Sequence, residues 1–137
     1  MPDKTFFDSN VLIYAIVSGD SRREQAQQLV AQGGAISVQV LNEFIAVARR
    51  KMRMPWEEVF EALDAVRILF PSPVAITIHT HEMAVRIAQQ YRFGIYDALI
   101  ASSALEANCS TLYSEDLQEG QVIEKRVTVR NPFRLPG

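Results

Sequence analysis

Short apolar runs alternate with longer segments of helical periodicity along the sequence, and this alternation limits the possible folds more than any other feature. The short runs predict strands at residues 5–7, 35–38, 74–78 and 110–113, and residues 121–129 predict one or two further edge strands. The connections between the first four runs are long enough for parallel crossovers. We therefore expect a single α/β domain over residues 1–137, with a small parallel sheet sandwiched by helices.

The segments between these runs have the apolar spacing and the end signals of helices. Helices are predicted at residues 11–17, 22–32, 38–52, 56–70, 81–91 and 96–108. Asp20 or Ser21 is expected to cap the second of these helices, which stops before a pair of glycines. Thr77 or Thr80 is expected to cap the helix at 81–91.

The composition excludes several classes of protein. Hydrophobic residues make up 48% and charged residues 22% of the chain, as in ordinary globular proteins. No apolar stretch reaches membrane-spanning length, and Asp8 interrupts any secretion signal early. The single cysteine, Cys109, excludes an internal disulfide, is expected to be a small buried hydrophobe, and fits a reducing cytoplasm. The net charge of −2 is not that of a protein that binds nucleic acid through bulk positive charge, so any such role needs local patches or metal ions.

Four acidic residues fall where a ligand is expected in such a fold. Asp8 and Asp116 follow predicted strands, whereas Glu43 and Asp97 lie in the first turns of predicted helices. Ligands of open α/β sheets bind outside the carboxyl ends of the strands. These four carboxylates could therefore converge at one end of the sheet.

Each acid also has a structural explanation. Asp8 and Asp97 could favour helix N-termini, and Asp116 could be a turn residue. Taken singly, Asp8 and Asp116 fit these roles best, but Glu43 and Asp97 would point toward covered surface without a nearby partner. Carboxylates gathered in one cleft repel each other, and Mg²⁺ or Mn²⁺ removes this conflict. Together, the four acids favour a metal site for phosphodiester hydrolysis.

The segments that hold these acids resemble a known family. They are "FFDSNVLIYA", "SVQVLNEF", "IYDALIASSALEANCSTLYSEDLQEG" and the terminal "NPF". In order and spacing they are similar to the PIN-domain ribonucleases, specifically to toxins of VapBC-type toxin–antitoxin pairs. The resemblance implies that Asp8, Glu43, Asp97 and Asp116 are catalytic residues and metal ligands, with Asn10 and Ser114 supporting them. One difference is that Tyr96 stands where many relatives carry Trp.

The resemblance also implies an activity and partners. Family members of this type cut RNA with Mg²⁺ or Mn²⁺, usually form homodimers, and are silenced by an antitoxin whose C-terminal segment covers the active site. On this basis, Asp8, Asp97 and Asp116 would bind metal directly or through water, and Glu43 would hold or orient a water. That water would attack phosphorus and the 3′ oxygen would leave, so the products would carry 5′-phosphates.

Other polar residues have two interpretations each. Arg49 and Arg50 belong to the basic run "ARRKMR", where they could contact an RNA backbone or simply favour a helix C-terminus. His79 and His81 could ligate a transition metal, but surface positions are the better interpretation. Trp56 is expected to serve packing or an interface rather than base stacking.

The sequence lacks motifs that two other classes of phosphoryl-handling α/β domain need. A haloacid-dehalogenase-like phosphatase needs a second acid two residues after the first, where this chain has Asn10. A receiver domain needs a paired acid and a late lysine, and neither is evident. A non-catalytic PIN-like module and a structure-specific DNA nuclease both remain open at this point.

Overall fold

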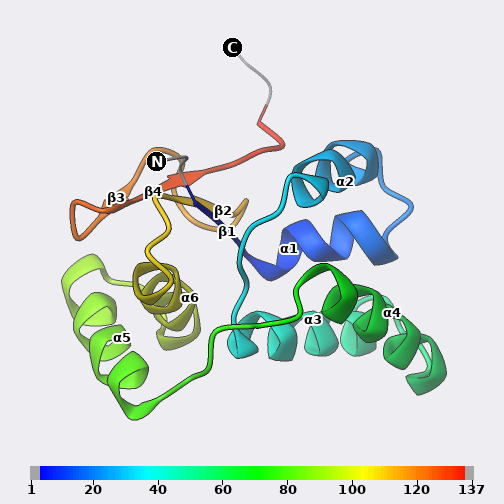
Figure 1. Cartoon of the computed structure of the whole chain (residues 1–137), viewed down its shortest axis with the longest axis horizontal. Helices are drawn as coiled ribbons and strands as arrows, with labels where there is room; N and C mark the ends of the chain where they lie inside the picture. Colours follow the sequence, from blue (N-terminus) through cyan, green and yellow to red (C-terminus); the bar gives the residue numbers. More distant parts are fainter. Residues whose placement is uncertain (1–3, 135–137) are drawn as a thin grey trace.

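The protein is built on a small, mostly parallel sheet. A computed structural model describes residues 4–134, and all structural statements refer to that range. The four strands are β1 (Thr5–Phe7), β2 (Thr111–Tyr113), β3 (Val122–Ile123) and β4 (Val127–Arg130). Their order is β1-β2-β4-β3, in which the first two pairings are parallel and the last is antiparallel (Figure 1). The predicted α/β class is confirmed.

Helices flank this sheet. They are α1 (Ser9–Leu12), the π-helix η1 (Ile13–Val17), α2 (Arg23–Ala31), α3 (Val38–Arg50), α4 (Trp56–Leu69), α5 (Ile78–Tyr91) and α6 (Ile95–Glu106). Helices α5 and α6 pack side by side next to the sheet, and α3 and α4 pair close to α1 (Figure 1). None of the helices within residues 4–134 has the combination of length and hydropathy needed to cross a membrane.

Two of the predicted strands are too long. Residues 35–38 and 74–78 contribute only the isolated parallel bridges Phe6–Ala35 and Ser37–Val74, which extend the sheet beyond β1. The two strands are shorter than predicted because helices begin within these segments: Ser37 caps α3, and Thr77 caps α5. The prediction for residues 121–129 also needs correction, because β3 is at the edge but β4 lies between β2 and β3.

The predicted helix caps are close to those observed. The Thr77 hydroxyl accepts a hydrogen bond from the Thr80 N–H at 3.2 Å, and the Thr80 hydroxyl accepts one from the Thr77 N–H at 3.0 Å. This reciprocal pair is a capping box, so α5 begins three residues earlier than predicted. For α2, the predicted cap is wrong by one or two positions: the N-cap is Arg22 and not Asp20 or Ser21, and no side chain within residues 4–134 caps the helix. Asp20 instead accepts a hydrogen bond from the Arg22 N–H at 2.9 Å in the turn before α2.

The two faces of the sheet are covered unequally. Phe6, Leu112 and Val129 are paired across β1, β2 and β4, and all three are fully buried in the core. The row one residue earlier carries three threonines, Thr5, Thr111 and Thr128, and all three are only half-buried. The Phe6 face is therefore completely covered. The other face is covered only in part, because Phe7, two residues after Thr5, is buried in the core while the threonine row is half-buried.

The register of β1 and β2 places two chain segments together at their carboxyl ends. Phe7 is paired with Tyr113, and the Asp8 N–H donates to the Tyr113 carbonyl at 3.0 Å. Residues that follow these two strands are thus neighbours, although more than 100 positions separate them in sequence. This is the edge at which the sequence predicts a site.

Candidate functional site

Asp8 lies at the centre of this edge. It is 2% exposed, and its carboxylate accepts hydrogen bonds from the Ser9 N–H and the Ser114 hydroxyl, both at 2.7 Å. The first of these bonds makes Asp8 the N-cap of α1, so the structural explanation for this residue is correct. It does not exclude metal binding, because each carboxylate oxygen can accept more than one partner.

Burial disfavours the charged form of Asp8. It raises the pKa of this carboxyl to about 6, against the opposing effect of the hydrogen bonds from Ser114 and Ser9. The charges of Asp116 and Asp97 add to the rise. The local structure thus holds a carboxylate that a nearby positive charge would stabilise.

Glu43 faces the same group of acids from α3. Burial, together with the charges of Asp8 and Asp97, raises its pKa to about 7, against the opposing effect of a hydrogen bond with Gln39. Its Oε2 atom is one of three buried side-chain oxygens in residues 4–134 that have no hydrogen-bond partner. Such an atom costs free energy unless something outside the described protein atoms binds it.

Asp97 and Asp116 complete the cluster from α6 and from the loop after β2. Asp97 is in the first turn of α6, where burial and then the charge of Asp116 raise its pKa. Asp116 is exposed, and its carboxylate accepts a hydrogen bond from Asn10 Nδ2 at 3.2 Å. The Ser114 hydroxyl accepts one from the Asp116 N–H at 3.1 Å.

The structure brings all six predicted site residues together. Asn10 Nδ2 lies 3.5 Å from Asp8 Oδ2 as well as near Asp116, so it links the two acids. Ser114 does the same through its hydroxyl, which donates to Asp8 and accepts from the loop. These two polar residues fix the positions of the carboxylates, as expected for groups that support metal ligands.

The chemistry of the cluster fits a hard divalent cation. Carboxylate oxygens are the ligands that Mg²⁺ and Mn²⁺ prefer, and the orphaned Glu43 oxygen and the raised pKa values of Asp8 and Glu43 indicate missing positive charge. Within residues 4–134, no group of three or more acidic, His or Cys side chains is arranged so that it could hold a metal ion. The donor set thus fits the ion by its chemistry, through its carboxylate oxygens, and not by the spacing of the side chains.

The other predicted residues lie outside this cluster. Arg49 donates to the Met54 carbonyl at 2.8 Å, and its guanidinium carbon is 4.6 Å from the centroid of the Trp56 ring. Arg49 thus joins the end of α3 to the start of α4, and Trp56 has the packing role expected of it. Arg50 is exposed.

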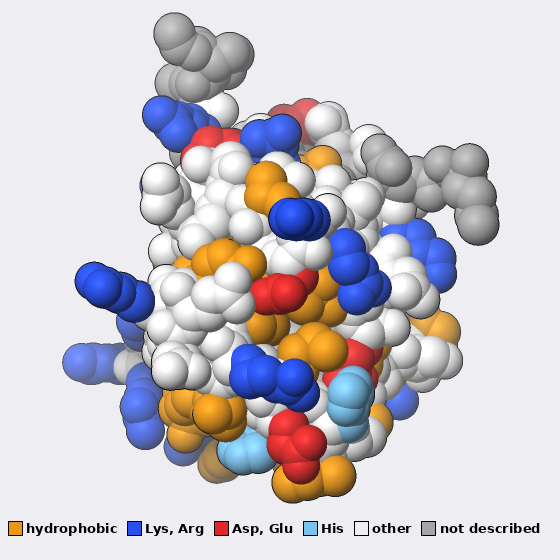
Figure 2. All heavy atoms as spheres, turned by 90° about the vertical axis from the view of Figure 1, so that its left-hand side faces the viewer, with side chains coloured by type: hydrophobic (Ala, Val, Ile, Leu, Met, Phe, Trp, Pro, Cys, Tyr) orange, Lys and Arg blue, Asp and Glu red, His pale blue; other side chains and the backbone are white. Residues whose placement is uncertain are grey.

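The histidines and the cysteine also have ordinary environments. His79 and His81 are exposed in the first turn of α5, as predicted. Cys109 is 4% exposed, and burial raises the pKa of its thiol, which confirms its interpretation as a small buried side chain. On the face of the molecule seen in Figure 2, Lys and Arg side chains are interspersed with acidic and apolar ones.

Sequence reasoning missed two residues beside the acids. The Tyr14 hydroxyl donates to Glu115 and accepts from Arg22, and burial together with the Glu115 carboxylate raises the pKa of Tyr14 to about 12. The side-chain oxygen Oδ1 of Asn10 accepts from the Glu115 N–H at 3.4 Å. No sequence signal could have paired Tyr14 with Glu115, because the contact depends on the β1–β2 register.

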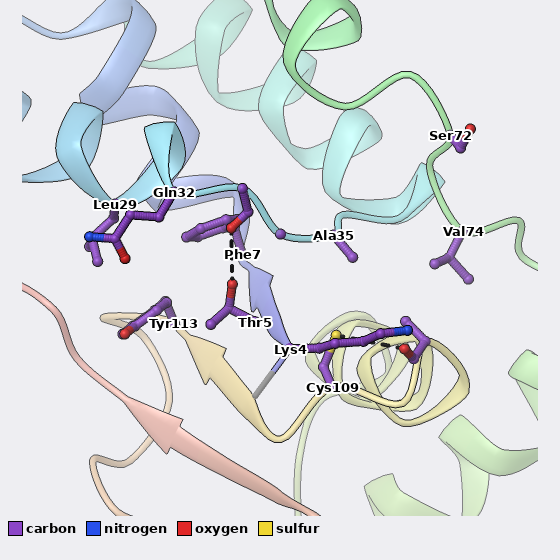
Figure 3. A pocket seen from close by; sticks show the side chains of 13 residues that line it. Lys4, Thr5, Phe7, Leu29, Gln32, Ala35, Ser72, Val74, Cys109 and Tyr113 are labelled. Carbon is purple, nitrogen blue, oxygen red and sulfur yellow. Dashed lines mark hydrogen bonds between the residues drawn. The ribbon is translucent and has the colours of Figure 1, made fainter. Parts of the chain in front are cut away.

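Two hollows lie near the sheet. The first, the large cavity, has a volume of about 590 Å³, and Lys4, Phe7, Gly34, Cys109 and Tyr113 are among its lining residues (Figure 3). Its described lining residues include none of the four acids. The second, the Lys51 cleft, has a volume of about 210 Å³. Its lining includes Asn10, Ile13, Val47, Lys51, Met52 and Asp116, so it opens directly beside the acids.

Comparison with solved structures shows the same fold in chains from bacterial toxin–antitoxin systems. A chain of a toxin–antitoxin complex from Klebsiella pneumoniae has a TM-score of 0.71 and 21% identity, over 96% of this chain and 100% of that chain. VapC20 of Mycobacterium tuberculosis, a sarcin–ricin loop cleaving toxin, has a TM-score of 0.64 and 18% identity, over 81% and 88% of the two chains. VapBC2 from Rickettsia felis, bound to a DNA fragment from its promoter, has a TM-score of 0.60 and 22% identity, over 93% and 97%.

Comparison of the sequence itself gives the family. No curated protein sequence matches the chain significantly. The sequence model of the PIN domain matches residues 5–120, a range that includes all four acids, Asn10 and Ser114. The chain therefore belongs to the PIN-domain family.

Proposed function

We propose that the chain is a metal-dependent endoribonuclease and the toxin of a type II toxin–antitoxin pair. The observation that carries this proposal is the cluster of four carboxylates, in which Asp8 and Glu43 have raised pKa values and Glu43 Oε2 has no partner among the described residues. Membership of the PIN-domain family and the fold shared with VapC toxins support it.

In this proposal three of the acids bind metal and the fourth, Glu43, acts as a proton acceptor. Asp8, Asp97 and Asp116 hold Mg²⁺ or Mn²⁺, which supplies Lewis acidity and a more acidic water. Ser114 and Asn10 keep Asp8 and Asp116 in place through the hydrogen bonds described above. Glu43 accepts a proton from the attacking water, a task for which a pKa of about 7 is well matched at neutral pH.

The bond changes follow from these roles. The water oxygen attacks phosphorus, its proton passes to Glu43, and the bond from phosphorus to the 3′ oxygen breaks. The leaving 3′ oxygen takes a proton from solvent water. The ribose 2′-hydroxyl takes no part as a nucleophile. The products therefore carry a 5′-phosphate and a 3′-hydroxyl.

The proposed partners follow from the family and from the similar structures. One of these is a toxin–antitoxin complex and another is a VapBC assembly. We propose a cognate antitoxin whose C-terminal segment covers the acidic cluster, a homodimer, and a cytoplasmic location. A small reading frame beside the gene for this chain would be the first evidence of the antitoxin.

A cleavage assay tests the function. Purified protein is incubated with RNA or DNA and with Mg²⁺, Mn²⁺ or a chelator, beside Asp8→Asn and Asp97→Asn. Asp64→Asn is the matched control, because Asp64 is exposed on α4 and is not among the site residues. Only the wild type and the control should cleave RNA, and only with metal.

The other outcomes identify the alternatives. Metal-independent cleavage, undiminished cleavage by the two site variants, or 2′,3′-cyclic phosphate ends would refute the proposed mechanism. Cleavage of DNA alone would indicate the structure-specific DNA nuclease. Nucleic-acid binding without any cleavage would indicate the non-catalytic module.

A further inference from the structure

The basic run at the end of α3 separates into residues with different surroundings. Arg49 is engaged within the protein by the Met54 carbonyl and the Trp56 ring. Lys51, which follows α3 directly, instead lines the Lys51 cleft together with Asn10 and Asp116. One cation of this run therefore stands in the same hollow as part of the acidic cluster.

The Lys51 cleft combines charged and apolar lining residues. Its acids are Asp116 and Glu115, of which Glu115 accepts a hydrogen bond from Tyr14. Lys51 supplies a cation, and Ile13, Val47 and Met52 contribute apolar side chains. Its volume of about 210 Å³ is too small for a folded RNA element but has room for a single base with its sugar. Nucleotides combine an apolar ring with a flanking phosphate, and the cleft offers a surface for each.

The wall of this cleft is held in place by a hydrogen-bond network. Tyr14 also lines the cleft, and its hydroxyl is fixed between Glu115 and Arg22. Ile13 and Tyr14 belong to η1, whose π-turn is closed by a hydrogen bond of 2.9 Å from the Ser18 N–H to the Ile13 carbonyl. Single π-turns occur frequently at functional sites. The cleft is thus formed before any ligand binds.

We propose that the Lys51 cleft binds the nucleotide next to the scissile phosphate, with its base against Ile13, Val47 and Met52 and its outer phosphate on Lys51. The inference rests on the proposed ribonuclease function and adds the site that positions the RNA strand. A single-stranded substrate fits this arrangement, because a base within a duplex would not be free to enter the cleft. The alternative for Lys51 is a cation that only favours the C-terminus of α3.

The first experiment tests the phosphate contact. Cleavage of a short single-stranded RNA is measured over a range of salt concentrations for the wild type, Lys51→Met and Lys51→Arg. Arg67→Met is the control, because Arg67 is an exposed cation in the last turn of α4. The slope of log(kcat/KM) against log[salt] is negative, and loss of one phosphate contact should make it less negative by about 0.7. Lys51→Met should show this change, whereas Lys51→Arg and Arg67→Met should keep the wild-type slope.

The second experiment tests the base contact. RNA substrates carry one abasic residue, moved stepwise along the strand past the cleaved bond. For the wild type, kcat/KM should fall about tenfold when the abasic residue is directly beside that bond on one side, and should change little at more distant positions. Val47→Phe, which fills the cleft, should cut the intact RNA more slowly and lose this dependence on position.

The outcomes separate this inference from the proposed function. If the wild type cuts RNA but Lys51→Met keeps the wild-type slope, or the abasic position has no effect, the cleft is not the nucleotide site and the ribonuclease stands. A lower melting temperature for Lys51→Met without a change of slope would favour the helix-end role and overturn the inference. If the wild type cuts no RNA with either metal, the inference and the proposed function fall together.

Discussion

The large cavity has the greater volume, but the smaller Lys51 cleft is the one that adjoins the acidic cluster. The large cavity, of about 590 Å³, lies among Lys4, Phe7 and Tyr113, where the only thiol of the chain, Cys109, has a pKa raised by burial. The Lys51 cleft, of about 210 Å³, adjoins carboxylates that perturb one another. Volume follows from incomplete packing on the half-covered face of the sheet, whereas chemistry follows from charges that the fold forces together.

The largest expected effect is a difference in RNA cleavage between a variant of the acidic cluster and a variant of the large cavity. Glu43→Gln should lower kcat/KM for RNA cleavage by about 10²- to 10⁴-fold, because it removes the proton acceptor. Ser72→Trp places a large side chain at the large cavity, where Ser72 is an exposed lining residue, and should leave kcat/KM within about threefold. Steady-state kinetics on one RNA substrate measure both. A severe loss in Ser72→Trp with a mild one in Glu43→Gln would reverse the assignment.

The next effect concerns stability against pH in the metal-free protein. Asp8 binds its proton more tightly when folded, with a pKa of about 6 against an ordinary value of 3.8. Between these values the folded state carries more protons than the unfolded state, so the free energy of unfolding falls as pH rises. From pH 4 to 7, Asp8 alone should account for a loss of about 2 kcal/mol. Glu43, with a pKa of about 7, extends the fall toward neutral pH.

Urea unfolding in chelator measures this loss, and Asp8→Asn is the control. The difference between the two proteins isolates Asp8 from other groups, such as Glu119, whose lowered pKa acts in the opposite direction. Adding Mg²⁺ or Mn²⁺ should restore stability at pH 7 in the wild type but not in Asp8→Asn. Identical pH profiles for the two proteins would show that folding does not raise the pKa of Asp8.

The smallest effect tests whether the large cavity has a structural role alone. A Cβ at Gly34 would lie 2.5 Å from a ring carbon of Phe7 and 2.9 Å from the Thr5 carbonyl oxygen. Gly34→Ala should therefore lower the free energy of unfolding by about 1–3 kcal/mol, because β1 or the Phe7 ring must shift. Thermal melting measures this loss.

Cleavage by Gly34→Ala, measured well below its melting temperature, should stay close to the wild type. The matched substitution Gly19→Ala should leave both quantities unchanged, because nothing lies within 4 Å of a Cβ built there. A strong loss of cleavage in folded Gly34→Ala would mean that the large cavity is coupled to the chemistry.

Much of the fold follows from local signals in the sequence. The helices from residue 38 to residue 106 have apolar periodicity, and Thr77 was recognisable as the cap of α5. The capping role of Ser37 was missed, because this residue was assigned to a strand. The strands at 35–38 and 74–78 were overestimated, because an apolar run is compatible with either a strand or the start of a capped helix. The place of β4 inside the sheet could not be predicted, since pairing order depends on contacts distant in sequence.

The site divides in the same way. The acids could be found from their positions after strands and early in helices, because parallel strands bring their carboxyl ends to one edge. Asp97 is in the first turn of α6 as predicted, whereas Glu43 lies in the second turn of α3. The Tyr14–Glu115 contact and the different environments of Arg49 and Lys51 could not be found, since neighbours in a basic run look alike until the helix end is placed in space.

Calorimetric titration of Mn²⁺ into the metal-free protein near pH 6.5 tests whether the four carboxylates form a metal centre. At that pH, Asp8 and Glu43 are partly protonated, and an ion bound among the four carboxylates should displace about one proton. Repeating the titration in buffers of different ionisation enthalpy gives the number of protons released. Binding with proton release is expected in the wild type and in Asp64→Asn, and little binding is expected in Asp8→Asn. Equal binding by wild type and Asp8→Asn, or binding without proton release, would contradict a metal centre built on these acids.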